Sequence, residues 1–378
     1  KMAVKKYRIA IIGCGMICNA AHMPSIAELM KKGFAEVVAV ADIRECAARE
    51  TAKRWGIPAW YTDPQQMLDE VKPDWVSVCT PNVYHKKWSV AALRAGAHVM
   101  CEKPMALTYQ DAKEMFDEAN KAGKLLWACQ SRRWSADMDF AYQAMRDGDI
   151  GRPYFADISF VRRFGIPTWG FFHMKEHNGG GSFCDLGVHF IDALLWMCDN
   201  PRVEAVSGMQ TDVLAKKKED ILLSIKESGA YIGTFTPRKY DPDEFSVEEF
   251  AAGTMRLAGN FLVNFKFTWA LNQPTAKHFL ICGDKGGIDV EKFMLYKNVG
   301  KFQSETELKY FDNRPFAGVA FDAHRYMYEH VYNVIEGREE RLVKPEETLN
   351  VVAAIEAFYR SAAENREIRT VELGGYEL

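Results

Sequence analysis

The chain lacks several features that mark special classes of protein. Its 378 residues contain no apolar run long enough to span a membrane, no low-complexity tract and no internal repeat. The 48 lysines and arginines nearly balance the 51 acidic residues. The resulting formal charge of −3 gives no electrostatic case for binding nucleic acid or an anionic membrane. With 48% hydrophobic residues, the composition is that of an ordinary soluble globular protein.

A disulfide framework is also missing. The nine cysteines include no Cys-x-x-Cys pair, and Cys14, Cys79, Cys101 and Cys129 lie in or beside expected core strands. Free thiols of this kind are typical of a reducing compartment. The first expected strand starts too early to leave room for a secretory segment, so we expect a cytoplasmic protein.

The strongest positive signal lies in the first fifteen residues. The apolar run at 7–12 predicts a buried parallel strand, which continues directly into Gly13-Cys14-Gly15. A strand that ends in Gly-x-Gly and opens a helix presents backbone N–H groups to a pyrophosphate, although here Cys18 replaces the third glycine. The residues that we expect to bind a dinucleotide at this turn are Gly13, Gly15, Met16 and Ile17.

An acidic residue ends the second expected strand. Asp42 follows the apolar run at 37–41, where a carboxylate accepts hydrogen bonds from the adenosine ribose and repels a 2′-phosphate. This favours NAD over NADP, although Arg44 could bind that phosphate. Asp42 and Glu45 also match a capping box for the next helix, and the two interpretations are compatible.

Strands and helices alternate over the first third of the chain. We expect strands at residues 7–12, 37–41, 59–61, 74–79, 98–101 and 125–128. Helices are expected between them, after Gly15 and over residues 42–55, 64–70, 84–95 and 108–123. This alternation predicts a doubly wound parallel sheet.

The pattern changes near residue 130. A helix at 137–147 precedes strand-like stretches at 154–161, 203–214, 230–236, 249–257, 260–269 and 277–282, and helices at 321–336 and 346–365 close the chain. Short turns between adjacent strands predict a largely antiparallel sheet. The fold class we expect is therefore α/β. A cofactor-binding domain spans 1–129, and a second α/β domain with a large, mostly antiparallel open sheet spans 130–378.

Two further segments end strands of the parallel sheet. Thr80-Pro81-Asn82, with His85 following, is either a turn in which Asn82 caps a helix or part of the cofactor crevice. Glu102-Lys103-Pro104 ends the fifth strand. A lysine there would ordinarily be a solvated surface charge, but near a nicotinamide it can bind a substrate hydroxyl and stabilise a developing alkoxide.

Three glycines precede an acid and a histidine in the second half. Gly179-Gly180-Gly181 permits close approach of the backbone to a ligand or to another strand. If the following segment is helical, Asp185 and His189 share a face as i and i+4. Three interpretations stay open: a helix-end carboxylate with a buried histidine, a metal site with His173 and His177, or acid–base catalysis by histidine. No metal-binding signature supports the second, so we expect no metal.

An aromatic loop follows the strand at 154–161. The stretch at 162–172 contains two arginines and four aromatic residues, including Arg163 and Trp169. It is either a packed loop or oligomer contact, or a carbohydrate-binding surface, since aromatic faces stack on sugars and arginines bond to hydroxyls.

Taken together, these motifs resemble those of the Gfo/Idh/MocA oxidoreductases over nearly the whole chain. The segments that carry the resemblance are Gly13-Cys14-Gly15 with His22 and Pro24, Thr80-Pro81-Asn82 with His85, Glu102-Lys103-Pro104, Gly179-Gly180-Gly181 with Asp185 and His189, and the late Glu356-Ala357 with Arg360-Ser361. The spacing of the Glu-Lys-Pro and Asp-x-Gly-x-His elements is the most specific of these.

The resemblance implies a Rossmann domain, a second sheet that commonly mediates homo-oligomers such as dimers or tetramers, and NAD(P)-linked oxidation or reduction of sugars or polyols. It places Lys103, Asp185 and His189 in the catalytic positions, with Glu102 and Lys103 beside the cofactor. His189 is expected as proton acceptor, Asp185 as the group that orients it or a substrate hydroxyl, and Lys103 as the group that polarises the reacting hydroxyl. Whether Lys103 or His189 is the base stays open.

We expect an NAD-dependent dehydrogenase acting on a secondary alcohol of a sugar, polyol or glycoside, such as the C3 hydroxyl. Substrate contacts are expected from Lys103, Arg163, Trp169, Asp185 and His189. One alternative is oxidation-assisted glycoside cleavage, in which a transient 3-keto sugar eliminates the aglycone. The other is a non-catalytic dinucleotide-binding regulator, against which the intact Lys103, Asp185 and His189 argue.

Overall fold

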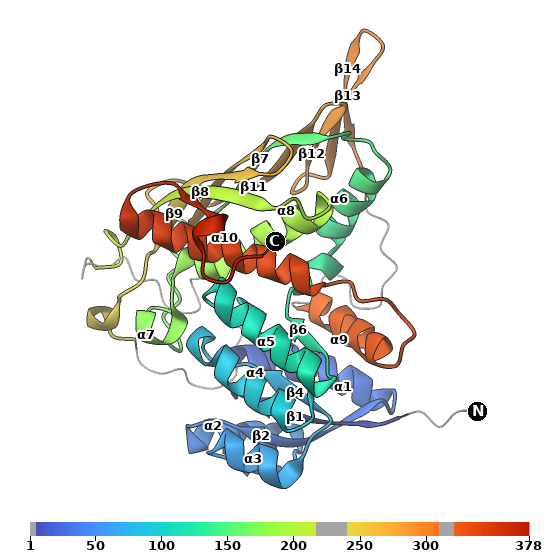
Figure 1. Cartoon of the computed structure of the whole chain (residues 1–378), viewed down its shortest axis with the longest axis vertical. Coiled ribbons are helices and arrows are strands. Elements are labelled where there is room, and N and C mark those ends of the chain that lie inside the picture. The colour runs from blue at the N-terminus through green and yellow to red at the C-terminus, as the bar shows by residue number, and fades with distance from the viewer. Residues whose placement is uncertain (1–4, 217–239, 310–320, 378) are drawn as a thin grey trace.

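A computed structural model describes residues 5–216, 240–309 and 321–377. Two sheets of different type dominate it, one in each half of the chain (Figure 1). The first is a six-stranded parallel sheet and the second a nine-stranded, mostly antiparallel sheet, so the expected fold class is confirmed.

The first sheet has the strand order β3-β2-β1-β4-β5-β6. Its strands are β1 (Tyr7–Ile12), β2 (Ala35–Ala41), β3 (Ala59–Tyr61), β4 (Trp75–Val78), β5 (His98–Cys101) and β6 (Leu126–Ala128). All pair in parallel, and the central strands are buried on both faces, which explains their near-continuous apolar runs. Because the strands are parallel, their carboxyl ends meet along one edge, where the turns of the predicted site begin.

The connecting helices match their predicted places. They are α1 (Met23–Lys31), α2 (Glu45–Trp55), α3 (Pro64–Val71), α4 (His85–Arg94) and α5 (Tyr109–Ala122). Thr108 caps α5 by accepting the Asp111 N–H, and Gly123 ends that helix in the left-handed conformation, as its sequence predicts.

The predicted capping box at Asp42 is wrong. Helix α2 has Arg44, not Asp42, at its N-cap, and no side chain caps it. The Asp42 carboxylate instead accepts the backbone N–H groups of Cys14 and Arg44, both at 2.9 Å. Asp42 and Glu45 have the spacing of a capping box, but the end of β2 places the Asp42 carboxylate against the glycine turn instead of at the start of α2.

The second sheet has the order β14-β13-β12-β11-β7-β10-β9-β8-β15. Its strands are β7 (Pro153–Val161), β8 (Val203–Thr211), β9 (Phe250–Leu257), β10 (Phe261–Thr268), β11 (Ala276–Gly283), β12 (Gly286–Asp289), β13 (Met294–Val299), β14 (Phe302–Glu307) and β15 (Ile368–Arg369). Every pair is antiparallel except β7 with β10. Strands β12 to β15 were not predicted, and the predicted strand at 230–236 lies outside the described residues.

One face of this sheet forms the second core. In β10, Val263, Phe265 and Phe267 are buried while the residues between them are less so, the alternation expected of a strand with one apolar face. Ring contacts join Phe190 to this face, tilted against Phe267 and stacked on Phe279. The helices of this half are α6 (Ala136–Arg146), α7 (Lys175–Asn178), α8 (Val188–Met197), α9 (Asp322–Ile335) and α10 (Pro345–Glu364).

Helix α9 returns to the first core, although it comes near the end of the chain. Tyr328 stacks on Trp75 of β4 with ring centroids 5.4 Å apart, and Tyr332 stacks on Phe34 at 4.3 Å. Helix α10 lies between the two sheets, in contact with β8 and with α5 (Figure 1). The last third of the chain therefore contributes to both cores.

Over the described residues, no helix combines the length and apolarity that crossing a membrane would require.

A buried charge cluster fastens the second half together. Arg133, fully buried, donates from Nε and Nη2 to the two carboxylate oxygens of Asp192 on α8, at 3.0 and 2.6 Å. It also pairs with Glu347 at the start of α10. Two parallel bonds between a guanidinium and a carboxylate fix both groups, so this residue sets the position of α8, the helix that begins beside Asp185.

We predict that Arg133→Ala lowers the free energy of unfolding by about 3–5 kcal/mol, because it leaves the Asp192 carboxylate buried without its partner. Urea denaturation followed by circular dichroism measures the change. Arg94→Ala, which removes an exposed pair with Glu118, is the matched control and should change stability by less than about 1 kcal/mol. Equal effects of the two substitutions would contradict the structural role of Arg133.

Candidate active site

The glycine turn after β1 has the shape that a dinucleotide requires. Gly13 has φ +97°, and a Cβ there would lie 2.5 Å from the backbone oxygen of Cys79, so β1 and β4 pack too closely for any side chain. A Cβ on Gly15 would meet no atom within 4 Å. The helix opens at the next residue, Met16, so its first N–H groups face this open space. The turn therefore fits a pyrophosphate in front of Gly15.

The helix after this turn is not regular. Met16 and Ile17 are half-buried in its first turn, and Cys18–His22 is π-helical before α1 begins. Cys18 is fully buried, so the residue that replaces the third glycine packs inside the protein rather than toward the turn.

Asp42 is held beside the same turn. Each of its carboxylate oxygens accepts one backbone N–H, and Oδ1 also accepts the Arg44 Nε–H, so a lone pair for a ribose hydroxyl remains on Oδ2. The Arg44 guanidinium lies 3.4 Å from Asp42 Oδ1 through Nε. The positive charge that could have bound a 2′-phosphate is thus paired with the carboxylate.

The segment after β4 links the two halves. Asn82 does not cap a helix, because Pro81 precedes the short 3₁₀ turn Asn82–Tyr84 and Tyr84 is the N-cap of α4. Its side-chain amide donates instead to the backbone oxygen of Asn178 at 2.9 Å. His85 is fully buried, with its ring nitrogens 2.8 and 2.9 Å from the backbone oxygens of Pro104 and Thr80. His85 therefore braces the turns after β4 and β5 against each other.

Lys103 and Asp185 meet between the two halves of the chain. Lys103 Nζ donates to Asp185 Oδ1 at 3.2 Å and to the Asp185 backbone oxygen at 3.1 Å. Trp269, which follows β10, donates its indole N–H to Asp185 Oδ2 at 3.0 Å. Both side chains of the ion pair are about 15% exposed, so it stands at the edge of the interior. The arrangement presents one ammonium group that is fixed by two oxygen atoms of Asp185 and is still reachable.

Asp185 stays ionised in this setting. Burial raises the pKa of its carboxyl, but the positive charges of Lys103 and Arg162 and the Trp269 hydrogen bond outweigh burial and hold that pKa below its usual range. Asp185 lies in the π-helical segment Phe183–Gly187, which leads into α8. The condition considered from the sequence, a regular helix from residue 185, is therefore met only from Val188 onward.

His189, in the first turn of α8, is neutral. Burial lowers the pKa of its imidazole well below the usual value, and the charges of Lys103 and Arg132 lower it further. Its Nδ1 is buried and has no hydrogen-bond partner within the described ranges. Because both Asp185 oxygens bond elsewhere, to Lys103 and Trp269, the acid orients the lysine rather than this histidine.

The three glycines pack against protein. A Cβ on Gly180 would lie 2.0 Å from the Tyr359 hydroxyl, and one on Gly181 would lie 2.0 Å from the backbone oxygen of Glu248. The buried Glu248 carboxylate accepts the N–H groups of Gly181 and Phe183 at 2.8 and 3.0 Å, and the Tyr359 hydroxyl at 2.9 Å. The close approach that the glycines permit is therefore to helix α10 and to the segment before β9, not to a strand as expected.

The aromatic loop gives a mixed result. Arg163 is exposed, with its guanidinium over the Phe164 ring, whereas its neighbour Arg162 is the arginine whose charge acts on Asp185. Trp169 is buried, with its ring 5.9 Å from that of Phe172. Arg162 was missed because strand alternation was not extended past Val161. Residues 158, 160 and 162 share the inner face of the strand.

The histidines near the glycines do not converge. His173 Nε2 lies 3.4 Å from a Glu244 carboxylate oxygen, and His177 Nδ1 lies 3.2 Å from the Tyr84 hydroxyl. Each has its own protein partner, so this pair offers no shared site for a metal.

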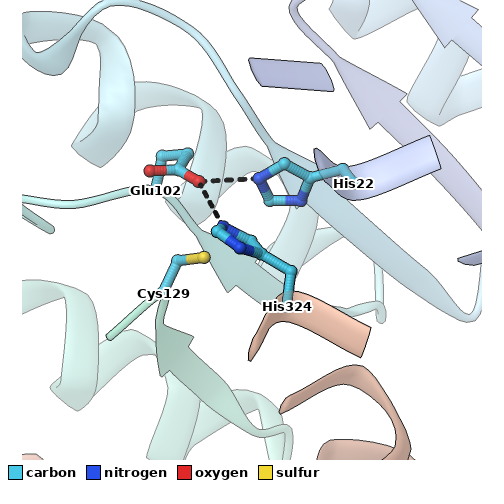
Figure 2. A group of neighbouring side chains, drawn as sticks. All are labelled: His22, Glu102, Cys129 and His324. Carbon is cyan, nitrogen blue, oxygen red and sulfur yellow. Dashed lines mark hydrogen bonds and ion pairs between the residues drawn. The ribbon is translucent and has the colours of Figure 1, made fainter. Parts of the chain in front are cut away.

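Glu102 is buried rather than open to the crevice. Its Oε1 lies 2.7 Å from His22 Nε2, and its Oε2 accepts the backbone N–H of Lys103 at 3.0 Å (Figure 2). Burial opposes ionisation of the carboxyl, but the His22 hydrogen bond holds its pKa well below the usual range. The side chain thus fixes Lys103 from behind. His22 was part of the family pattern, but no sequence signal pointed to this contact.

Comparison with known proteins agrees with this geometry. Residues 7–129 match the oxidoreductase family described by its NAD-binding Rossmann fold, and residues 143–373 match that family's C-terminal alpha/beta domain. The chain belongs to the Gfo/Idh/MocA oxidoreductase family. The predicted family and its NAD(P)-binding Rossmann domain are confirmed.

Named Gfo/Idh/MocA relatives include sugar dehydrogenases. The D-glucoside 3-dehydrogenase of Escherichia coli (strain K12) is 30% identical over 364 residues, which cover 96% of this chain and 97% of that protein. The D-apiose dehydrogenase of Paraburkholderia graminis is 27% identical over 265 residues, 68% of this chain and 69% of that protein.

Solved structures share the fold over the whole length. An oxidoreductase domain protein from Kribbella flavida superposes with a TM-score of 0.79 at 20% identity, covering 97% of this chain and 99% of that one. A levoglucosan dehydrogenase in complex with NADH gives a TM-score of 0.79 at 17% identity, with the same coverage of both chains. The two-sheet arrangement is therefore one that experimentally determined structures also adopt.

The two turn glycines make a matched pair of substitutions. We predict that Gly13→Ala destabilises the protein by about 1–3 kcal/mol, because its Cβ overlaps Cys79 and its φ is positive. Gly15→Ala should leave the melting temperature unchanged but weaken NADH binding at least about 10-fold, since its Cβ projects into the open space. Thermal melts and fluorescence titration with NADH test both. Unchanged NADH affinity in Gly15→Ala would place the cofactor elsewhere.

Proposed function

We propose that this protein is an NAD-dependent dehydrogenase that oxidises a ring secondary alcohol of a glucoside or related sugar, with the C3 hydroxyl as the first candidate. The observation that carries the proposal is the Lys103–Asp185 pair at the carboxyl edge of the parallel sheet, with the neutral His189 within reach of the lysine's charge. The D-glucoside 3-dehydrogenase of Escherichia coli, similar over 96% of this chain, supports the choice of substrate class.

Lys103 binds the reacting hydroxyl. Its ammonium is held by the Asp185 carboxylate and backbone oxygen, while Glu102 fixes its backbone from behind. One N–H of the ammonium therefore remains for a substrate oxygen, in an orientation that the protein has already set. As the hydroxyl loses its proton, negative charge develops on that oxygen and the ammonium stabilises it, an effect worth several kcal/mol in a partly buried site.

His189 accepts the hydroxyl proton. Its lowered pKa keeps the imidazole neutral at physiological pH, which is the form that can take up a proton. The Lys103 side chain bonds to Asp185, so the two groups have separate roles: the lysine holds the oxygen and the histidine removes its hydrogen. Bound NAD supplies the hydride acceptor for the carbon-bound hydrogen.

Substrate contacts beyond the reacting hydroxyl come from the strand that ends in Val161. We propose Arg162 as the arginine that faces the site, since its charge acts on Asp185. Arg163 and Trp169, proposed from the sequence, would contact only the outer part of a larger glycoside, because Arg163 is exposed and Trp169 is packed against Phe172.

The structure favours NAD as the coenzyme. Asp42 Oδ2 retains a lone pair for a ribose hydroxyl, and the negative charge of the carboxylate would repel a 2′-phosphate at the same place. Arg44 is already paired with Asp42.

The activity is tested by incubating the protein and NAD with sugars, inositols and O- and C-glycosides, and analysing the products by mass spectrometry. We expect loss of two hydrogens from a glucoside with matching formation of NADH, and weaker turnover with NADP. Release of aglycone without net NADH would replace the proposal with oxidation-assisted cleavage. Bound NAD with no product from the whole panel would contradict the proposal.

Substitutions separate binding from chemistry. We predict that Lys103→Met and His189→Gln each lower kcat about 10²–10⁴-fold, since one removes the charge that stabilises the alkoxide and the other the proton acceptor. NADH affinity should stay within a few-fold. The control is Lys87→Met, which changes an exposed lysine on α4 and should leave kcat unaltered. Full activity in either site variant would exclude the assigned role.

The acid side of the pH profile should reflect the lowered pKa of His189. Lys103, Arg132, Glu102 and His324 are the charged and titratable groups that act on this ring, and burial is the largest influence. Because a base with a lowered pKa stays deprotonated to lower pH, kcat/KM should remain level from pH 7.5 to 6. An exposed histidine with pKa about 6.5 would lose about fourfold over that range. A fourfold fall would show that His189 is not the buried base.

A further inference from the structure

Four buried side chains that are far apart in the sequence lie close together beside the candidate active site, next to Lys103. They are His22 from the π-helical turn before α1, Glu102 at the end of β5, Cys129 after β6 and His324 from α9 (Figure 2). One ligand-type atom from each residue lies within 4.8 Å of all the others. In Figure 2 the Glu102 carboxylate and the two imidazoles converge on one region, with the Cys129 sulfur below it.

We propose that His22, Glu102, Cys129 and His324 form a binding site for one divalent transition-metal ion, with zinc as the best match. Two imidazoles, one thiolate and one carboxylate are ligands that zinc takes in tetrahedral protein sites. The mixture of soft sulfur and nitrogen disfavours magnesium and calcium, which prefer oxygen. This inference is independent of the proposed dehydrogenase activity.

The spacing of the four residues suits a single ion. His22 Nε2 and Glu102 Oε1 are 2.7 Å apart, and His324 Nε2 lies 4.0 Å from the same oxygen. In a tetrahedral zinc site with bonds of about 2.0–2.3 Å, neighbouring ligand atoms lie about 3.3–3.7 Å apart. The observed distances fall on either side of this range, so side-chain movements of about 1 Å would complete the site.

The surroundings hold two of the ligands in place. His22 Nδ1 lies 2.6 Å from the Tyr328 hydroxyl, which in turn lies 2.7 Å from the Ser77 hydroxyl. The ring is thus turned with Nε2 toward the centre of the group. Glu102 Oε2 accepts the Lys103 N–H, which leaves Oε1 for the ion. Outer hydrogen bonds of this kind orient the ligands of known metal sites.

His324 supplies an independent indication that a ligand is missing. It is only 7% exposed, and its Nδ1 is buried with no hydrogen-bond partner in the part of the chain that the structure describes. Its nearest ion-pair contact, to Glu102, is at 4.0 Å, beyond hydrogen-bond distance. Nε2 therefore also has no hydrogen-bond partner among the described residues, and a metal ion bound to Nε2 would give this buried ring the polar contact that it lacks, with the ring proton on Nδ1.

The charges also balance. A divalent ion with the Glu102 carboxylate and the Cys129 thiolate is neutral overall, which a buried site requires. On binding, the Cys129 thiol releases one proton to solvent. The His22 proton moves from Nε2 to Nδ1, where the Tyr328 oxygen accepts it. Four protein ligands close the site, so the ion would have a structural role, joining α9 to β5 and β6.

The test uses the full chain, treated with chelator, incubated with Zn²⁺ or Co²⁺ and passed through a desalting column. We expect one ion per chain by elemental analysis, and for Co²⁺ a thiolate-to-metal charge-transfer absorption in the near ultraviolet. Retention of less than about 0.1 ion per chain for both metals would overturn the proposal.

Variants locate the ion. Cys129→Ser should remove the charge-transfer band. His324→Gln should weaken metal binding at least about 100-fold. Tyr328→Phe, which changes a residue that contacts a ligand and not the ion, should weaken metal binding by less, about 10–100-fold. The control is Cys282→Ser on β11, a free cysteine outside the group, which should keep the band. Circular dichroism checks that each variant is folded. A band that persists in folded Cys129→Ser would overturn the assignment.

Discussion

The contact between the Lys103 ammonium and Asp185 is the interaction on which the site depends, because it joins the two halves of the chain at their polar edge. Lys103 follows a strand of the parallel sheet, and Asp185 lies in the π-helical turn that leads into α8, which packs on the antiparallel sheet. A half-buried ion pair is stable only when its remaining hydrogen-bonding positions are filled. The Asp185 backbone oxygen accepts a second N–H of the ammonium, and Trp269 donates to the second oxygen of the aspartate. Glu102 holds the backbone N–H of Lys103.

Both halves place a chemically important residue in a π-helical turn. His22 ends the turn Cys18–His22, and Asp185 lies in the turn Phe183–Gly187, each directly before a regular helix. A π turn shifts side chains relative to the 3.6-residue spacing, so it can direct one residue inward without rotating the helix that follows. This explains why the i,i+4 relation of Asp185 and His189 did not produce a bonded pair.

Much of the fold was predictable because it follows local rules. Strands of the parallel sheet are continuous apolar runs. Thr108 starts α5 through its side-chain cap, and Gly123 ends it because glycine accepts the left-handed conformation. The short strands β12 to β15 were missed because several are polar or only two to six residues long, too short for an alternating pattern to stand out. Helix α9 was predicted as a helix, but no local signal shows which core it joins.

The residues of the candidate site also fall into those that the sequence could predict and those that it could not. Lys103, Asp185 and the glycine turn stand in contiguous motifs, so sequence alone could propose them. Trp269 donates a hydrogen bond to Asp185, and Glu248 accepts one from Gly181. Both partners lie next to strands of the antiparallel sheet, and no sequence rule fixes their distance from the motifs. The group of His22, Glu102, Cys129 and His324 spans three hundred residues, so no ligand spacing could reveal it.

The return of α9 to the first core has a consequence for how the chain is made. Tyr328 and Tyr332 cover Trp75 and Phe34, so the parallel sheet has an uncovered apolar side until residues 322–335 have left the ribosome. By then most of the antiparallel sheet has also been synthesised. We therefore expect the final packing of the first core to wait until nearly the whole chain has been made.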